Sequence, residues 1–249
     1  MTKTKPTCLT RLRKRLAKMR EIKILLASGN RHKAREFSGF FSELPPFGDA
    51  KLALLSPGDL SCELPEVEET GASYEENALL KAAAFARAAG MPAIADDSGI
   101  EVRALGGEPG VRSARAAEGS DPDRVNWLLD RMRGIRDRVA CFTACLVIAF
   151  PNGKNIFGAA ERDYFSAEGR CFGTLAETPR GTRGFGYDPV FTPDGYGATF
   201  GELGDEIKSR ISHRAIAFKG VAQIVPSVLK YIAVHHNENC NGDLGRCTN

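Results

Sequence analysis

Near the start of the chain a short apolar run and the polar turn after it decide the fold: Ile22-Lys23-Ile24-Leu25-Leu26-Ala27, then Ser28-Gly29-Asn30-Arg31-His32-Lys33. The run has the length and apolar content of a buried β-strand. Beyond the turn, apolar residues recur at positions 34, 37, 40 and 41, the spacing of one helix face. A strand, a polar turn and a helix in succession predict an α/β fold.

The polar turn is also a candidate phosphate-binding element. A helix N-terminus carries unpaired backbone N–H groups and a partial positive charge, both of which suit phosphate. Gly29 lets the backbone approach a ligand closely, Asn30 can donate through its amide, and Lys33 adds a positive charge. The alternative is that Ser-Gly-Asn is simply favourable turn chemistry. The candidate residues are Ser28, Gly29, Asn30, Arg31, His32 and Lys33.

The rest of the chain continues the α/β pattern. A capping box at Ser73 and Glu76 starts a helix that should end at Gly90. A short strand at 92–95 should stop at the Asp96-Asp97 pair. We further expect one strand within 43–72, a helix from about 120, strands at 139–150 and 154–164, and a last helix at 212–235 that Pro226 should kink.

The charge distribution separates the ends of the chain from its body. Eight of the 34 Lys and Arg residues lie in residues 1–20, which contain no acid, so acidic side chains outnumber basic ones in the remainder. We therefore expect a basic, unstructured extension at 1–20, a catalytic domain at 21–235 and a disordered polar tail at 236–249. A nucleic-acid partner is not expected, because its basic surface would be spread through the folded domain.

Hydropathy and cysteine content bear on location. No apolar stretch reaches the eighteen residues of a membrane span, so no membrane partner is expected. Seven cysteines form no CxxC pair and no zinc-spaced cluster. Together with the absence of a secretory signal, the odd count favours the cytoplasm and thiols free of disulfides.

Acidic side chains gather at two places. Glu66, Glu68 and Glu69 lie in a segment rich in proline and acid, and Asp96-Asp97-Ser98-Gly99 follows a short apolar strand. Hard cations such as Mg²⁺ bind carboxylate oxygens and often bridge to substrate phosphates. Carboxylates from two distant loops could form such a site, although a solvated acidic loop is the plainer interpretation of the glutamates.

Two later segments could contact a flat ligand. In the loop at 184–189, glycines flank Phe185, and either Phe185 or Tyr187 could stack on a base. The alternative is a β-turn whose aromatic rings pack into the core. At the entry to the last helix, His213 and Arg214 are placed against the helix dipole, and such a local conflict gives a functional explanation more weight.

Seven motifs along residues 22–233 are similar to those of one enzyme family. They are Ser-Gly-Asn-x-x-Lys at 28–33, Glu-Glu-Thr-Gly at 68–71, Glu-Asn-Ala-x-x-Lys-Ala at 76–82, Ala-Asp-Asp-Ser-Gly at 95–99, Leu-Gly-Gly-Glu-Pro-Gly at 105–110, Gly-Phe-Gly-Tyr-Asp-Pro at 184–189 and Ser-His-Arg at 212–214. In this order they resemble the inosine/xanthosine triphosphate pyrophosphatases, the Ham1-like proteins. One such motif can arise by chance, but seven in register make a strong signal.

The resemblance implies an elongated mixed β-sheet flanked by helices, two lobes with the substrate cleft between them, and a homodimer. It also implies Mg²⁺-dependent hydrolysis of the purine nucleotides ITP, dITP and XTP to the monophosphate and pyrophosphate. By motif position, residues 28–33 would hold the triphosphate, Glu68, Glu69 and Asp97 the metal, and Asp97 would also be the catalytic base. The implied nucleotide contacts are Ser98, Phe185, Gly186, Tyr187, Asp188, Lys208, His213 and Arg214.

Two alternative functions remain open. The related Maf-like pyrophosphatases act on other nucleotides, but the loop at 184–189 and the Ser-His-Arg ending argue against them. A nucleotide-binding module without turnover is less favoured, because both acidic motifs and Lys33 are present. For a pyrophosphatase of this family, selection of a 6-keto purine would require a donor facing the 6-position. Lys208, His213 and a backbone N–H are the candidates.

Overall fold

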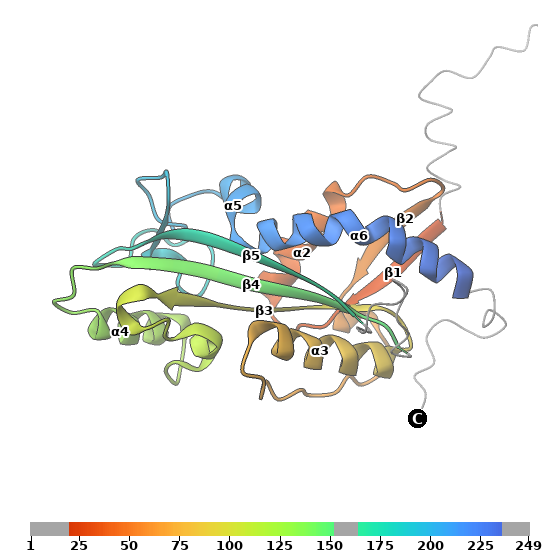
Figure 1. The fold of residues 1–249 in the computed structure, drawn as a ribbon, viewed down its shortest axis with the longest axis horizontal. Helices are drawn as coiled ribbons and strands as arrows, with labels where there is room; N and C mark the ends of the chain where they lie inside the picture. The colour runs from red at the N-terminus through yellow and green to blue at the C-terminus, as the bar shows by residue number, and fades with distance from the viewer. Residues whose placement is uncertain (1–19, 152–163, 236–249) are drawn as a thin grey trace, which may run out of the picture.

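The computed structural model describes residues 20–151 and 164–235, with side chains described as far as residue 229. Six strands form one sheet in the order β2-β1-β3-β4-β5-β6 (Figure 1). The strands are β1 (Arg20–Leu26), β2 (Ala50–Leu55), β3 (Ala93–Val102), β4 (Val139–Ala149), β5 (Tyr164–Leu175) and β6 (Phe191–Pro193). The predicted basic extension, except Arg20, and the predicted tail lie outside the described residues.

The sheet is mixed, as expected. Strand β1 runs parallel to β2 and β3, whereas β3, β4, β5 and β6 follow one another in antiparallel pairs. The three central strands are the longest, at 10 to 12 residues, and they give the molecule its elongated outline (Figure 1). Every residue of β4 from Ala140 onward is buried, because the strand is covered on both faces.

Helices cover both faces of the sheet (Figure 1). Helices α2 (Arg31–Glu43) and α6 (His213–His235) pack on one face, and α3 (Tyr74–Ala89) packs on the other. Alternation along the strands explains this arrangement, since Ile94 joins the core under α6 while its neighbours Ala93 and Ala95 join the core under α3. Helix α2 buries Phe37, Phe40 and Phe41, as the sequence periodicity predicts.

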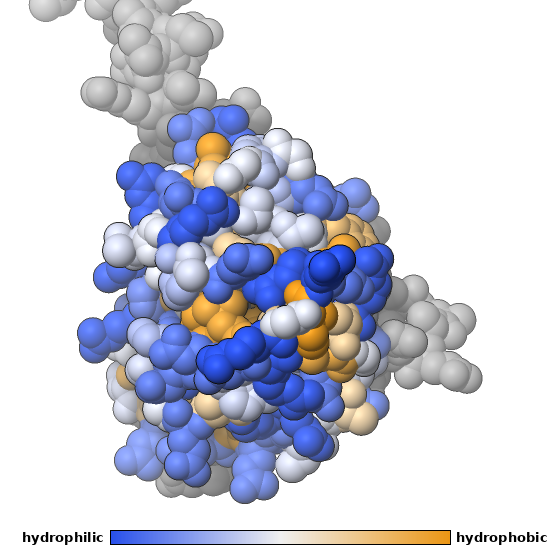
Figure 2. Space-filling model, turned by 90° about the vertical axis from the view of Figure 1, so that its left-hand side faces the viewer, coloured by the Kyte–Doolittle hydropathy of each residue, from blue (hydrophilic) through white to orange (hydrophobic). Residues whose placement is uncertain are grey.

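A second hydrophobic core lies at the end of the sheet away from β1 and α6. There α4 (Asp121–Arg131) packs with the outer halves of β3, β4 and β5 and with Phe191 and Phe200. This core and the one formed by α2, α6 and β1 are the two expected lobes. The short helix α5 (Asp205–Ile211) precedes α6. Figure 2 shows the end of the molecule that carries α4, where hydrophilic groups surround exposed hydrophobic patches.

Several expected boundaries were wrong. Strand β3 does not stop at Asp96 but continues to Val102, because its backbone pairs with β4 along its whole length. Helix α5 was missed, since seven residues carry too little periodicity. The strand expected at 154–164 lies almost wholly outside the described residues, and β5 begins at Tyr164. The predicted ends of α3 and the start of α4 are confirmed, with Ser73 capping α3 and Gly90 in the left-handed conformation after it.

The cysteine prediction also needs correction, because Cys62 is disulfide-bonded while Cys141, Cys145 and Cys171 are free and buried. In the part of the chain that the structure describes, none of the helices combines the length and hydropathy that a bilayer crossing requires.

Close packing of α6 on β5 depends on Gly169. A Cβ atom added there would overlap the backbone oxygen of His213 and the backbone nitrogen of Ala217. The absence of a side chain at this position therefore sets how closely the start of α6 can approach the sheet.

Gly169→Ala should lower the free energy of unfolding by roughly 1–3 kcal/mol, because the added methyl group must push α6 away from β5. Gly39→Ala in α2 is the matched control: nothing lies within 4 Å of its added Cβ. That control should gain roughly 0.4–1 kcal/mol from reduced freedom of the unfolded chain. Denaturant unfolding of both variants measures the difference, and an unaffected Gly169→Ala protein would show that the contact can relax.

Candidate active site

A cavity of about 630 Å³ opens between the two lobes. Its walls come from the β1–α2 turn, the acidic loop before α3, the middle of β3, the start of α4, the loop before β6 and the start of α6. The lining residues that the sequence had singled out are Ser28, Gly29, Asn30, Lys33, Glu68, Glu69, Ser98, Phe185, Gly186, Tyr187, Asp188, His213 and Arg214. Segments more than 180 residues apart thus meet at one site.

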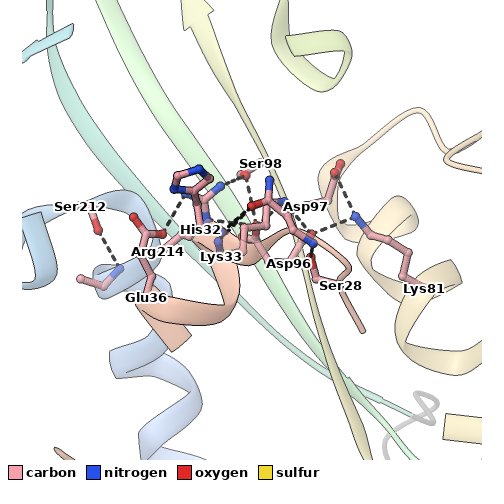
Figure 3. A network of polar contacts seen from close by, with 12 residues as sticks. Ser28, His32, Lys33, Glu36, Lys81, Asp96, Asp97, Ser98, Ser212 and Arg214 are labelled. Carbon is pink, nitrogen blue, oxygen red and sulfur yellow. Dashed lines mark hydrogen bonds and ion pairs between the residues drawn. The ribbon is translucent and has the colours of Figure 1, made fainter. Parts of the chain in front are cut away.

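At the back of this cavity is a buried charge network around Asp96 (Figure 3). Asp96 Oδ2 lies 2.7 Å from Lys33 Nζ and 3.1 Å from Arg214 Nε. Ser98 Oγ donates to the same oxygen at 3.2 Å and accepts from Arg214 at 2.6 Å. One carboxylate on β3 therefore joins α2 to α6.

Burial and charge oppose each other in this network. Burial alone would raise the pKa of Asp96, but Arg214 and Lys33 hold it far below its ordinary value. Burial lowers the pKa of Lys33, and Asp96 counteracts that shift. Arg214 loses solvation too, yet Asp96 and Glu36 raise its pKa. The shifts of Asp96 and Arg214 both favour the ionised forms at neutral pH.

The β1–α2 turn is organised differently from the sequence prediction. Asn30 caps α2, and its Oδ1 accepts from the backbone N–H groups of His32 at 2.9 Å and Lys33 at 3.2 Å. Those two N–H groups were expected to be available to phosphate, but the cap satisfies them. Ser28 Oγ accepts from the N–H of Asn30 at 3.2 Å and so stiffens the turn. The cationic group of this segment that faces the cavity is Lys33.

A second network lies on the α3 side of β3. Lys81 Nζ is 2.6 Å from Glu69 Oε1, 3.4 Å from Asp97 Oδ1 and 2.9 Å from the backbone oxygen of Asp96. Asn77 Nδ2 donates to the other oxygen of Asp97 at 3.2 Å, while Asn77 Oδ1 accepts from Gly71 N–H at 2.7 Å. Asp97 is thus held on both oxygens, and its side chain is 7% exposed behind Lys81.

The two carboxylates beside Lys81 differ in their proton affinity. Burial raises the pKa of Asp97, with Lys81 acting against this shift and Glu69 adding to it. Burial would also raise the pKa of Glu69, but Lys81 brings it below its ordinary value. A carboxylate of raised pKa next to one of lowered pKa is the pattern of a general base beside a group that stays charged.

The loop before β6 is held by its own aspartate and by α4. Asp188 Oδ2 accepts from Phe185 N–H at 2.8 Å and lies 2.7 Å from Lys208 Nζ. Gly186 N–H donates to Asp121 Oδ2 at 2.6 Å. Tyr187 is packed into the core and donates to the backbone oxygen of Ser113 at 2.9 Å. Of the two aromatic candidates, Phe185 is the one that remains partly open.

Phe185 already has neighbours. The His32 ring stacks on it, with centroids 5.1 Å apart, and Lys208 Nζ and Arg214 Cζ lie 4.7 and 5.0 Å from its centroid. Lys208 also pairs with Glu36 at 2.7 Å. Lys208 and His32 line a neighbouring cavity of about 490 Å³ between α2 and α5, rather than the main one.

His213 is buried against Phe142, and the two rings stack with centroids 4.7 Å apart. Burial and the nearby Arg214 lower its pKa well below the ordinary value, so the imidazole is neutral at pH 7. A neutral ring has no conflict with the helix dipole, whereas Arg214, in the first turn of α6, remains charged and is compensated by Asp96 and Glu36. Its Nδ1 atom has no hydrogen-bond partner among the described residues, although the ring lines the main cavity.

Other predicted residues lie at the margin. Arg31 is exposed and does not line the cavity, and Glu68 is exposed on the rim while Glu69 makes the contact with Lys81. Asp97 does not line the cavity either, because Lys81 stands in front of it. Side chains that the sequence analysis had not assigned a role, Glu36, Asn77, Lys81 and Asp121, hold the site together. Two of them, Asn77 and Lys81, belong to the Glu-Asn-Ala-x-x-Lys motif, which could have indicated a role for them.

Two carboxylates, those of Glu69 and Asp97, offer oxygen ligands to a hard cation. Within the described ranges, no three His, Cys, Asp or Glu side chains are grouped closely enough to hold a metal ion. Two ligands nevertheless suit Mg²⁺, which binds through one or two carboxylates and completes its shell with water and substrate phosphates.

The fold and the motifs define a family. The model of the Ham1 family matches residues 24–224, and the chain belongs to that family. A dITP/XTP pyrophosphatase of Thermus thermophilus is 45% identical over 208 residues, which cover 82% of this chain and 92% of that protein. A dITP/XTP pyrophosphatase of Deinococcus radiodurans is 46% identical over 78% of this chain and 88% of its own.

Solved structures agree with this assignment. The Staphylococcus aureus Ham1 protein superposes with a TM-score of 0.67 at 34% identity, over 82% of this chain and 97% of its own. The Mycobacterium abscessus nucleoside-triphosphatase or dITP/XTP pyrophosphatase gives a TM-score of 0.61 at 38% identity, over 80% and 98% of the two chains.

Asp96→Asn should destabilise the protein by about 3–5 kcal/mol, because Lys33 would lose its carboxylate partner in a buried site and Arg214 would keep only Glu36. The folded pKa of Asp96 lies below its unfolded value of about 3.9. Its stabilisation is therefore complete above that pH and declines as pH falls, and the unfolding free energy of the native chain should drop more steeply on acidification than that of the variant.

Chemical denaturation at several pH values between neutral and acid measures both effects. Asp137→Asn, which removes an exposed partner of Arg103, is the control and should change little. Equal stability of Asp96→Asn and the native chain would contradict the central place given to this carboxylate.

Proposed function

We propose that this protein hydrolyses the non-standard purine nucleoside triphosphates ITP, dITP and XTP to the nucleoside monophosphate and pyrophosphate. The observation that carries the proposal is the meeting of Lys33, Lys81 and Glu69 at one cleft that Phe185 and His213 also line, with Asp97 in contact with Lys81. The proposal is further supported by the names of the curated relatives. Residues 21–235 would form the catalytic domain.

Hydrolysis of a phosphoanhydride needs the charge of the phosphates to be balanced and a water molecule to be oriented. Lys33 lines the cavity at the N-terminus of α2 and supplies a fixed positive charge beside the β1–α2 turn. Residues 28–33 would hold the triphosphate there. The raised pKa of Asp97 suits a group that accepts a proton from water.

Glu69 and Asp97 would hold Mg²⁺, with Glu68 nearby on the same loop. The ion would supply charge neutralisation on the phosphate oxygens. Both carboxylates lie close to the same ammonium group, since Lys81 Nζ is 2.6 Å from Glu69 Oε1 and 3.4 Å from Asp97 Oδ1. Asn77 fixes the orientation of Asp97 through its second oxygen.

The purine base of the nucleotide would occupy the end of the cleft away from the metal ligands, against Ser98, the loop at 185–188 and the start of α6. Stacking on Phe185 would require the His32 ring to move from the face that it covers. Neutral His213 has one donor and one acceptor nitrogen, so it would favour a 6-keto oxygen over a 6-amino group only with its N–H directed at the 6-position. Lys208 and Arg214 offer only donors.

We also propose that the protein acts as a homodimer in the cytoplasm, where its nucleotide substrates would be. Family resemblance supports the dimer, and a sedimenting mass equal to that of one chain would exclude it. Cell fractionation addresses the location.

The direct test is pyrophosphate release from ITP, dITP, XTP, GTP and ATP, with Mg²⁺ and with chelator. We expect Mg²⁺-dependent release, fastest with the 6-keto non-standard nucleotides. Asp97→Asn should reduce kcat by about 10²–10⁴-fold through loss of the base. Lys33→Ala should reduce kcat/KM by roughly tenfold or more through loss of a charged phosphate contact.

Release from none of the nucleotides would exclude the hydrolase. Binding without release would favour a nucleotide-binding module, and preference for other bases would favour a Maf-like activity.

His213→Ala and Lys208→Ala separate the candidates for base recognition. Loss of the group that reads the 6-position should lower the ratio of kcat/KM for ITP over ATP by about tenfold or more, because a buried donor would otherwise be left facing the 6-amino group. The ratio is measured for both variants and for Asp137→Asn, whose side chain does not line the cleft, as a reference. If neither variant changes the ratio, neither His213 nor Lys208 reads the 6-position.

A further inference from the structure

Lys81 stands in a cage of oxygen atoms. Its ammonium group contacts Glu69 Oε1 at 2.6 Å. It also contacts the backbone oxygen of Asp96 at 2.9 Å and Asp97 Oδ1 at 3.4 Å (Figure 3). The side chain comes from the second turn of α3, and it is only 13% exposed. A single positive charge therefore lies at the point where an acidic loop and β3 converge.

The carboxylates of this cage also have contacts other than Lys81. Asn77 donates to the second oxygen of Asp97 and accepts from Gly71 N–H, so it ties the acidic loop to β3. Arg115 lies 3.5 Å from the second oxygen of Glu69. These contacts would keep the two carboxylates facing each other if the ammonium group left.

Glu69 and Asp97 are the same carboxylates that the proposed function assigns to the divalent cation, on which the present inference rests. A Mg²⁺ ion binds oxygen at about 2.0–2.1 Å and cannot share its coordination space with an ammonium group that contacts the same oxygens. Two cations so close would also repel each other strongly in a poorly solvated site.

We propose that the Lys81 ammonium is a resident cation, which fills the divalent-cation position while the metal is absent and has to leave before the metal binds. The four-carbon stem of lysine is flexible enough for this movement. Lys81 also lines the main cavity, so the displaced ammonium would face the substrate phosphates. Its departure would uncover Asp97, which lies behind it.

The proposal predicts that the affinity for the metal should rise, not fall, when Lys81 is removed. Removing an ordinary active-site residue weakens ligand binding, whereas removing Lys81 should strengthen metal binding in the absence of nucleotide. Lys81→Met keeps the length and packing of the stem and removes the charge. Its affinity for Mn²⁺, measured by electron paramagnetic resonance or calorimetry without nucleotide, should rise on the order of tenfold. Unchanged or weaker Mn²⁺ binding by a folded variant would overturn the proposal.

Lys33→Met is the matched control, because it separates the effect of filling the metal position from the general effect of a nearby positive charge. Lys33 Nζ also contacts the backbone oxygen of Asp96, at 3.3 Å, but its carboxylate partner is Asp96 rather than Glu69 or Asp97. This variant loses the same charge nearby without vacating the cage, so its Mn²⁺ affinity should rise less. An equal rise in both variants would mean that general charge, not displacement, controls the metal. Lys81→Gln, a neutral and polar replacement, repeats the test if Lys81→Met does not fold.

The native chain offers a further measurement. The reactivity of Lys81 toward an amine-modifying reagent, mapped by mass spectrometry of peptides, should increase several-fold at saturating Mg²⁺, because the ammonium leaves its carboxylate partners. Unaltered reactivity would contradict the displacement. Neither measurement depends on turnover: failure of the pyrophosphate assay would leave the Mn²⁺ result standing, and failure of the Mn²⁺ test would leave hydrolysis by the native enzyme untouched.

Discussion

The buried carboxylate of Asp96 is the interaction on which the site depends. Lys33 from α2 and Arg214 from α6 both point at one oxygen of this side chain, and Ser98 completes the network. Each cation loses solvation that the aspartate alone does not fully replace, so the three groups are stable only together. The turn that precedes α2, the strand at the centre of the sheet and the entry of the last helix are therefore fixed relative to one another by charge as well as by packing.

On either side of the Asp96 network, the site has a separate network of hydrogen bonds and ion pairs. On the α3 side, Lys81 and Asn77 order the acidic loop and Asp97. On the α6 side, Glu36 joins Lys208 to Arg214, and Asp188 fixes the backbone at Phe185. Glu36 and Lys33 are one turn apart on α2, so this helix connects the two ends. A nucleotide spanning the cleft would contact both networks at once, which makes the relative placement of the lobes part of its recognition.

Local patterns in the sequence predicted much of this arrangement. The periodicity of α2, the capping of α3 and the mixed α/β class follow from residues close together in the chain, and the ordered motifs identify which segments meet. The sequence could not predict that Asp96 would pair with Lys33 and Arg214 while Asp97 faces Lys81, because the two aspartates differ only in the partners that the fold brings to them. Nor could it predict that Lys81 would contact Asp97, because Lys33, Lys81 and Arg214 lie 15 to 118 positions from the aspartates that they contact. The Asn30 cap, in contrast, is local, and the preference of asparagine for the N-cap could have indicated it.

The adjacency of Asp96 and Asp97 on β3 has a consequence for how the gene can vary. Neighbouring residues on a strand face opposite sides of the sheet. A single-residue insertion or deletion upstream in β3 would shift the register by one and exchange the sides on which the two carboxylates emerge. Asp96 would then face α3, and Asp97 would meet the buried arginine. A substitution in this strand changes one side chain, but a change in its length before the aspartate pair would alter the contacts at both ends of the cleft together.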